Sequence, residues 1–259
     1  MGKMIEAKGL TFLHRGAKNP VLTQIAFQAK GGEVTAILGP NGSGKTTIFQ
    51  CILGIWKFQE GQIRLSGEPV NQLKRAEIAK RVSSVPQEHD PPFAYSCLDI
   101  VLMGRTAHVG VFSSPSHKDT ALAGEAMRTL GIDHLAQRPY TQMSGGERQM
   151  VLIARCLAQD APAMLLDEPT AHLDFRNQIT ILKKVKQLVG QRGLVALMNL
   201  HDPNMALLFS DHVLLLKDGT IVAQGKPHEV ITRESLLEVY GLEVEFVAEN
   251  GFRVICPKI

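Results

Sequence analysis

Gly39-Pro40-Asn41-Gly42-Ser43-Gly44-Lys45-Thr46 is the stretch of sequence that decides the fold. It matches the pattern G-x-x-x-x-G-K-[ST] in full, and its glycines let successive backbone N–H groups converge on phosphate oxygens. The lysine supplies a positive charge for the β- and γ-phosphates, and the threonine hydroxyl ligates Mg²⁺. A β-rich apolar run at residues 33–38 leads into the stretch, and residues 46–53 have the pattern of a helix. Because the positive end of that helix points at the phosphates, the sequence predicts a phosphate-binding loop between a strand and a helix.

A second glycine signature, Ser144-Gly145-Gly146-Glu147, lies far downstream of the first. One nucleotide does not need two glycine loops so far apart in one chain. We therefore expect each copy to carry two half-sites. Two copies would hold ATP between the phosphate loop of one and the glycine signature of the other.

Two carboxylates, Asp167 and Glu168, end an apolar run that begins at Ala163. In the functional interpretation, Asp167 orients Mg²⁺ through its water shell and Glu168 polarises the attacking water as a general base. The alternative is a pair of solvated acids that ends a strand before Pro169. The phosphate loop elsewhere in the chain favours the functional interpretation.

Size and composition bound the class of protein. The 259 residues fit one elaborated domain or two small ones, and the net charge of +3 comes from well-mixed acids and bases, which gives no case for nucleic acid. No stretch approaches the roughly 20 apolar residues that span a bilayer, and residues 1–6 lack the apolar core of a secretory signal. We therefore expect a cytosolic protein that needs a separate spanning partner for any membrane role. The four cysteines form no C-x-x-C pair, so we expect reduced structural thiols.

The hydrophobic pattern alternates between strands and helices. Strands are predicted at residues 4–13, 20–29, 33–38, 61–65, 82–87, 163–166, 194–197 and 212–216. Helices are predicted at residues 46–53, 175–189 and 229–240, and through most of residues 96–158 apart from breaks at 110–116 and 138–140. Turn signals at residues 89–93, Asp218-Gly219 and Asn250-Gly251 predict a break and two hairpins, the second over residues 244–255. Such alternation favours an α/β fold with a mostly parallel sheet and ligands at the carboxyl ends of the strands.

In these motifs the sequence resembles the nucleotide-binding subunit of ATP-binding cassette (ABC) transporters over essentially its whole length. Ser144 to Gln149 matches the family's signature, Gln87 its Q-loop, residues 171–174 its D-loop and His201 its switch histidine. The resemblance implies a P-loop NTPase core with a mostly parallel sheet, an N-terminal antiparallel β subdomain and an inserted α-helical subdomain. It further implies a single domain over residues 1–259, with the core and β subdomain at 1–87 and 161–259 and the helical subdomain at 88–160.

The resemblance also implies roles for the motif residues. Gln87 would touch Mg²⁺ and the attacking water, while His201 would hold the γ-phosphate and position Glu168. Asp174 would connect the two sites of a homodimer across the interface. The signature would hold the γ-phosphate of the nucleotide bound by the other subunit, because a helix N-terminus is a natural anion site. Mg²⁺ would be held by Thr46, Gln87 and Asp167.

An aromatic side chain usually stacks on the adenine ring in this family, and the register from Leu10-Thr11-Phe12 puts His14 there. Phe12 is the alternative, because it lies on the same face of the strand at period two. The resemblance assigns ATP binding to Gly39, Pro40, Asn41, Gly42, Ser43, Gly44, Lys45, Thr46, Thr47 and His14. A second departure from the family is Asn199-Leu200 before the switch histidine, where threonines are common, and the sequence gives no account of it.

A finer resemblance is to the importer branch that handles metal chelates such as iron-siderophores, heme and cobalamin, and some molybdate importers are similar there. It rests on residues 92–96, 101–105, 139–140 and 169–175. The segment from Gln87 to Arg105 would accept a helix of the membrane permease, with Phe93, Tyr95 and Arg105 as the exposed contacts. The implied assembly is an ATPase homodimer with Mg²⁺ and ATP, on two permease subunits at the cytoplasmic face of the membrane, served by a substrate-binding protein. A non-transport ATPase of the iron–sulfur assembly type and an exporter cassette remain as alternatives, and the cargo stays open.

Overall fold

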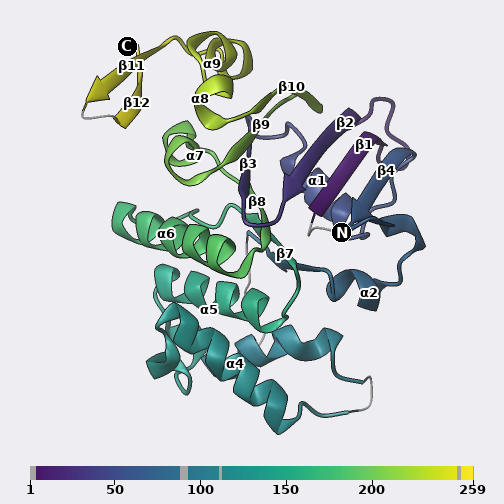
Figure 1. Cartoon of the computed structure of the whole chain (residues 1–259), viewed down its shortest axis with the longest axis vertical. Helices are drawn as coiled ribbons and strands as arrows, with labels where there is room; N and C mark the ends of the chain where they lie inside the picture. Colours follow the sequence, from purple (N-terminus) through teal and green to yellow (C-terminus); the bar gives the residue numbers. More distant parts are fainter. Residues whose placement is uncertain (1–3, 88–92, 111–112, 250–251, 259) are drawn as a thin grey trace.

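The computed structural model describes residues 4–87, 93–110, 113–249 and 252–258, in which strands and helices alternate (Figure 1). The strands are β1 (Met4–Phe12), β2 (Leu22–Lys30), β3 (Val34–Leu38), β4 (Glu60–Leu65), β5 (Glu68–Pro69), β6 (Val82–Val85), β7 (Ala163–Asp167), β8 (Val195–Asn199), β9 (His212–Lys217), β10 (Thr220–Gly225), β11 (Val244–Glu249) and β12 (Phe252–Pro257). The α-helices are α1 (Lys45–Ile52), α2 (Arg75–Ala79), α3 (Cys97–Leu102), α4 (His117–Leu130), α5 (Gly145–Ala158), α6 (Phe175–Arg192), α7 (Pro203–Phe209), α8 (Pro227–Val230) and α9 (Arg233–Tyr240). The predicted α/β class is confirmed.

A six-stranded sheet in the order β10-β9-β3-β8-β7-β6 forms the centre of the molecule. Its strands run parallel except for β10, which pairs antiparallel with β9 across the predicted hairpin. Strands β3, β7 and β8 are buried along their whole length, as parallel strands covered on both faces must be. The carboxyl ends of β3, β7 and β8 therefore lie next to one another at one edge of the sheet.

Two hydrophobic clusters cover the two faces of this sheet. Along β3, Val34, Ala36 and Leu38 pack into one cluster with α3, α4, α5 and α6, while Ile37 packs into the other with α1. The second cluster also takes in the four-stranded antiparallel sheet β2-β1-β4-β5. Because side chains alternate along the strand, the antiparallel sheet and the helical block pack on opposite faces of the six-stranded sheet.

The helical block consists of α3, α4 and α5, which pack against one another below the main sheet in Figure 1. These helices lie within residues 88–160, where the helical subdomain was predicted. The predicted boundary at residue 88 and most of the predicted break at residues 89–93 lie outside the described residues. The division of residues 1–259 into subdomains stays a prediction.

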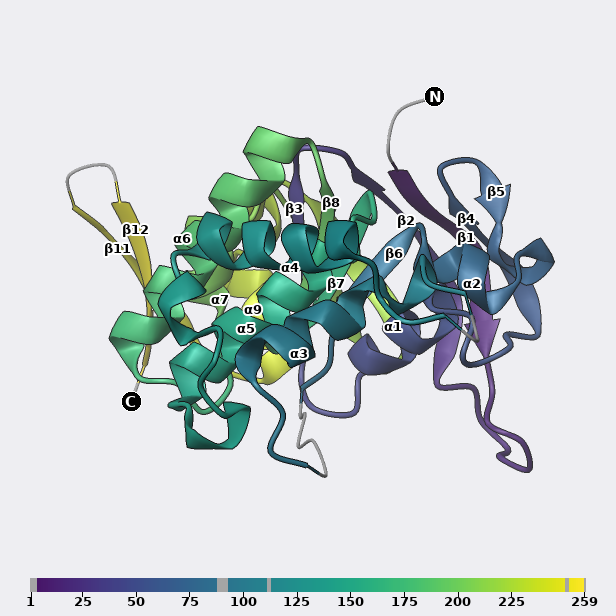
Figure 2. The ribbon, with the colours of Figure 1, turned by 90° about the horizontal axis from the view of Figure 1, so that it is seen from below.

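The C-terminal hairpin β11–β12 lies at the end of the molecule farthest from the antiparallel sheet (Figure 2). It is attached to α7: the Ile255 N–H donates to Asn204 Oδ1 at 2.8 Å, and Asn204 Nδ2 donates to the Ile255 carbonyl at 3.3 Å. The hairpin was predicted, whereas its predicted turn at Asn250-Gly251 lies outside the described residues.

One helical prediction needs correction, and two helices were missed. The predicted helix at residues 229–240 is two helices, because the side chain of Thr232 accepts a hydrogen bond from the Ser235 N–H and starts α9. Helices α2 and α7 were not predicted. A signal for α7 was present, since Asp202 caps it and Pro203 occupies its first turn.

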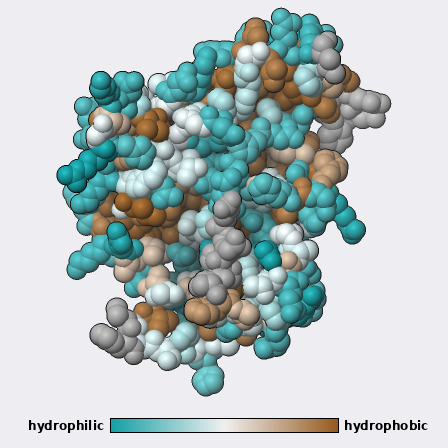
Figure 3. Space-filling model, turned by 180° about the vertical axis from the view of Figure 1, so that it is seen from behind, coloured by the Kyte–Doolittle hydropathy of each residue, from teal (hydrophilic) through white to brown (hydrophobic). Residues whose placement is uncertain are grey.

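Within the described ranges, no helix combines the length and the hydropathy that crossing a bilayer requires. On the face drawn in Figure 3, apolar side chains gather in separate groups among hydrophilic ones. That face therefore carries no continuous apolar belt.

Candidate nucleotide-binding site

The phosphate loop joins the end of β3 to the start of α1, as the sequence predicts. Gly39 has a φ of 155°, and a Cβ at this position would lie 2.2 Å from the Leu216 carbonyl oxygen of β9. No other residue type fits there without moving the backbone of the neighbouring strand. The loop is therefore fixed against the sheet at its first residue, and α1 begins at Lys45.

Lys45 is 6% exposed, and its ammonium group donates to the carbonyl oxygens of Gly39 at 2.8 Å and Pro40 at 3.1 Å. Burial lowers the pKa of Lys45, and the nearby carboxylates of Glu168 and Asp167 act in the opposite direction. A buried cation that is held mainly by carbonyl oxygens is well placed to exchange them for phosphate oxygens, which carry charge.

The Asp167 carboxylate, at the end of β7, is 7% exposed. Its Oδ1 accepts a hydrogen bond from the Thr46 hydroxyl at 3.4 Å and one from Asn199 Nδ2 at 2.6 Å. The hydroxyl and carboxylate that the sequence assigns to Mg²⁺ are therefore brought together, along with an amide that it did not assign.

The Glu168 carboxylate lies between two side chains from other parts of the chain. Gln87 Nε2 donates to its Oε2 at 2.8 Å, and His201 Nε2 lies 2.5 Å from its Oε1. Glu168 adopts a φ of 53°, a conformation that is uncommon for residues other than glycine and that is found at functional sites. The structure thus joins three residues proposed for catalysis, although 81 positions separate the glutamine from the glutamate.

The signature forms the N-terminus of α5, where Ser144 is the N-cap. The Ser144 hydroxyl donates to Glu147 Oε2 at 2.7 Å, and the Glu147 N–H donates to the Ser144 oxygen at 3.4 Å. Hydrogen bonds from the backbone and side chain of Ser144 lower the pKa of Glu147. Glu147 therefore closes a capping box. In the part of the chain that the structure describes, no hydrogen bond joins residues 144–147 to residues 39–46.

Asp174 caps α6 and accepts hydrogen bonds from the Asn177 N–H at 2.8 Å and from Asn177 Nδ2 at 2.9 Å. The side chain of Asn177 in turn packs against the signature helix. A Cβ on Gly146 would lie 2.8 Å from Asn177 Cγ, which is too close for unshifted atoms. Asn177 was not found from the sequence, and it places the D-loop directly against the signature of the same chain.

Near the predicted adenine position, His14 is exposed and Phe12 is only 4% exposed. The Phe12 ring stacks on Trp56 with a centroid distance of 5.3 Å, and the His14 ring stands edge-on to both. Of the two candidates, only His14 offers an accessible ring. Stacking on adenine stays a prediction.

Of the three proposed permease contacts, one is misplaced. Phe93 is 66% exposed and its ring meets that of the half-buried Tyr95 edge-on at 5.9 Å. Arg105, in the 3₁₀ turn at residues 103–107, is 7% exposed, so the expectation of an exposed contact is wrong. Its guanidinium pairs with Asp119 at 3.0 Å and donates to the Ala158 carbonyl at 2.8 Å, which ties together α4 and α5.

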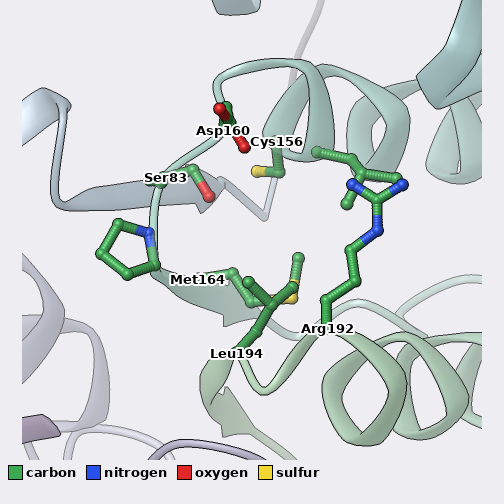
Figure 4. A pocket seen from close by; sticks show the side chains of 9 residues that line it. Ser83, Cys156, Asp160, Met164, Arg192 and Leu194 are labelled. Atoms are coloured by element: carbon green, nitrogen blue, oxygen red, sulfur yellow. The ribbon is translucent and has the colours of Figure 1, made fainter. Parts of the chain in front are cut away.

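The residues present fit Mg²⁺ and a nucleoside triphosphate. Thr46 and Asp167 offer the oxygen ligands and water-shell acceptors that Mg²⁺ prefers, and Lys45 and the start of α1 offer positive charge to phosphates. A separate cavity of about 230 Å³ lies at the opposite edge of the sheet, since Ser83, Met164 and Leu194 stand at the amino-terminal ends of β6, β7 and β8 (Figure 4). Cys156 lines it, and burial raises its pKa to about 11. Burial thus keeps this thiol in its protonated form, which is the less reactive one.

The chain is similar to known proteins along its length. The sequence model of the family described as ABC transporter matches residues 22–171. An iron chelatin transport ATP-binding protein of Helicobacter pylori is 36% identical over 253 residues, which are 97% of this chain and 98% of that one. A hemin import ATP-binding protein of Streptomyces coelicolor is 37% identical over 94% of this chain and 86% of its own length. A molybdate import ATP-binding protein of Haemophilus influenzae is 35% identical over 93% and 90%.

Solved structures agree with the sequence matches. An ABC transporter assigned to the metal-chelate type, in an inward-facing conformation, superposes with a TM-score of 0.88 at 31% identity and covers 99% of this chain and 98% of its own. The dimeric structure of a bacterial ABC transporter cassette superposes with a TM-score of 0.74 at 27% identity, over 86% of this chain and 98% of that one. The predicted P-loop NTPase fold is confirmed.

Proposed function

The chain belongs to the ABC transporter family, whose ATP-binding domains hydrolyse ATP to power transport, and from that premise we propose that it is the ATPase subunit of an importer. The cargo class is a metal chelate, with an oxyanion such as molybdate as the second possibility. Relatives named for iron chelate, hemin and molybdate support this range at nearly equal identity. The working unit is a homodimer on two permease subunits at the cytoplasmic face of the membrane, served by a substrate-binding protein.

The observation that carries the catalytic part of the proposal is the bracketing of Glu168 by Gln87 and His201. Both carboxylate oxygens are held, so the carboxylate has one orientation and can accept a proton from a water as general base. Bound ATP and Mg²⁺ supply the phosphoryl group and the charge neutralisation that its transfer needs. With nucleotide bound, His201 would hold the γ-phosphate and Gln87 would hold Mg²⁺, each from its place beside Glu168.

The binding part of the proposal assigns the triphosphate to residues 39–47 and the adenine ring to His14. Lys45 exchanges its two carbonyl contacts for phosphate oxygens. Thr46 and Asp167 would hold Mg²⁺ with its water shell, and Gln87 would complete that set. In the homodimer, the signature at residues 144–147 meets the nucleotide on the phosphate loop of the other copy, and Asp174 lies at the seam.

A hydrogen-bonded path supports coupling between the permease contact and the signature. The Tyr140 N–H donates to the Tyr95 carbonyl at 2.9 Å, and the Cys97 N–H donates to the Arg138 carbonyl at 2.9 Å. The segment that carries Phe93 and Tyr95 is therefore paired with the segment that enters the signature helix. A membrane helix docked on the first would follow the second when two copies close on ATP.

The test is to purify the tagged chain from its own cell membranes and to measure ATP-dependent cargo uptake. Transport predicts co-purification with a polytopic membrane protein. A wholly soluble complex would overturn transport and favour an assembly ATPase, and outward movement of cargo would favour an exporter. Comparing the rates at which reconstituted vesicles take up a metal chelate and molybdate distinguishes the two cargo classes.

Lys45→Ala tests the phosphate loop in the same experiment. It removes the buried ammonium, so ATP affinity should fall by at least about tenfold because a charge-assisted contact to phosphate is lost. Calorimetry on the purified chain measures the affinity, and the variant should keep the membrane partner while losing uptake. Unchanged ATP affinity would contradict the assigned role of the phosphate loop.

A further inference from the structure

Asn199 is a buried amide at the end of an otherwise apolar strand, Val195-Ala196-Leu197-Met198. It is 0% exposed. Strand register places it directly beside Asp167 on β7 and beside Ile37 on β3. It therefore sits between the strand that ends in the metal carboxylate and the strand that leads into the phosphate loop.

The side chain of Asn199 is committed to Asp167. Its Nδ2 donates to Asp167 Oδ1 at 2.6 Å, and the nitrogen end of the amide must face the carboxylate because an amide oxygen cannot donate. Its own Oδ1 is buried and has no hydrogen-bond partner among the described residues. Burying an amide with only part of its hydrogen bonds made is unfavourable, whereas an apolar side chain would fill this position without that cost.

The bond from Asn199 determines which oxygen of Asp167 remains available. Asn199 and Thr46 both donate to Oδ1, and among the described residues Oδ2 has no hydrogen bond. A carboxylate with one oxygen fixed by a charge-assisted hydrogen bond cannot rotate freely, so the second oxygen has one direction in which to meet a ligand.

We propose that Asn199 is a positioning residue for the metal: it fixes the Asp167 carboxylate so that Oδ2 meets the hydration shell of Mg²⁺. It acts through Asp167 and touches neither the nucleotide nor the reacting water. The inference rests on the proposed role of Asp167 in holding Mg²⁺. Asn199 is the first residue of the pair Asn199-Leu200 that departs from the family before the switch histidine.

The experiment measures the affinity of the purified full chain for the non-hydrolysable analogue AMP-PNP, with Mg²⁺ and with EDTA. The ratio of the two affinities is the gain that Mg²⁺ provides, and it does not depend on turnover. In Asn199→Leu, whose side chain has the same number and branching of heavy atoms but no donor, the gain should fall about tenfold, the factor expected for one charge-assisted hydrogen bond. The affinity in EDTA should stay within about twofold of the parent, because the phosphate loop is untouched.

Thr35→Val is the matched control, since Thr35 on β3 is also 0% exposed and its hydroxyl has no hydrogen-bond partner in the described chain. This control should keep the full Mg²⁺ gain. Asn199→Val is the second variant if Asn199→Leu does not fold, as judged by its melting temperature. A full Mg²⁺ gain in the folded Asn199 variant would overturn the proposal.

Asp167→Asn separates this proposal from the one on which it rests. If Asp167→Asn removes the Mg²⁺ gain while the Asn199 variant keeps it, only the role of Asn199 is wrong. If Asp167→Asn itself keeps the gain, the metal role of Asp167 is wrong and the role of Asn199 falls with it. Loss of the gain in both variants, with affinity in EDTA preserved, supports both.

Discussion

The phosphate loop and the signature, residues 39–46 and 144–147, both precede a helix, yet the fold holds their side chains in different ways. Lys45 is buried and bonded within its loop, and Thr46 reaches the Asp167 carboxylate of another strand. Ser144 and Gly145 are exposed, and the side chains of Ser144 and Glu147 bond to each other. The phosphate loop is organised inside the chain, and the signature presents accessible groups at its surface. The proposed two-copy site requires this difference, and three variants can break or sharpen it.

Glu168→Gln should have the largest effect, because it removes the general base from the organised half. Hydrolysis should fall by about 10²–10⁴-fold, the usual contribution of a positioned base. ATP binding should persist, since Lys45 and the loop are unchanged. The ATP-bound dimer should therefore accumulate, because it is no longer consumed by hydrolysis. A phosphate-release assay and size-exclusion chromatography with ATP measure the two effects. Hydrolysis at the parental rate would exclude Glu168 as the base. A variant that stays monomeric with ATP would contradict the proposed two-copy site.

Gly146→Ala tests the signature, of which Gly146 is a buried residue. The added methyl would lie 2.8 Å from Asn177 Cγ, so the signature helix must shift against the D-loop. Overpacking costs about 1–3 kcal/mol, and about 1.4 kcal/mol added to the activation barrier slows a reaction tenfold. We therefore expect hydrolysis to fall about tenfold, while the affinity of the single copy for AMP-PNP is kept. The double variant Gly146→Ala with Asn177→Ala should recover part of the rate, because it opens the space that the methyl needs. A parental rate in Gly146→Ala would show that the contact with Asn177 has no functional consequence.

Arg105→Met should have the smallest effect on chemistry, because Arg105 is a buried tie inside the helical block. Nucleotide affinity should stay within about twofold, while the melting temperature at pH 7 falls on the order of 5 °C. Hydrogen bonds from Ser116, and then from Arg105, lower the pKa of Asp119 from 3.8 to about 2. A carboxyl group whose pKa is lower in the folded state stabilises the fold at any pH above its pKa in the unfolded state. This stabilisation is lost as the pH falls through its pKa in the folded state. The deficit of the variant should therefore shrink between about pH 4 and pH 2.

Arg81→Met is the control for that series, since Arg81 pairs with Glu68 at 2.7 Å on the surface, where the glutamate side chain is 54% exposed. An exposed pair adds little stability, so its removal should hardly change the melting temperature. Scanning calorimetry from pH 7 to pH 2 measures both variants. Equal deficits for Arg81→Met and Arg105→Met would contradict the buried role of Arg105.

Much of the fold could be predicted because its signals are local. The loop at residues 39–46 needs glycine backbone and a lysine at fixed spacing, and the box formed by Ser144 and Glu147 lies within four consecutive residues. Short apolar runs, such as the one that ends in Asp167, and the strand period of two predicted the strands of the central sheet. Helix α2, of five residues, left too short a pattern, and the break at Thr232 was hidden inside a helical one.

By itself, the sequence determined the phosphate loop, the carboxylates at the end of β7, the capped signature helix and the alternation that builds a parallel sheet, because each depends on neighbours in the chain. Only the tertiary structure decided what strand order and packing bring together. It set Asn199 beside Asp167, packed Asn177 against Gly146, covered Phe12 with Trp56 and buried Arg105 against Asp119. Register between strands and the crossing of helices fix these contacts, and neither is written in the spacing of residues along one element.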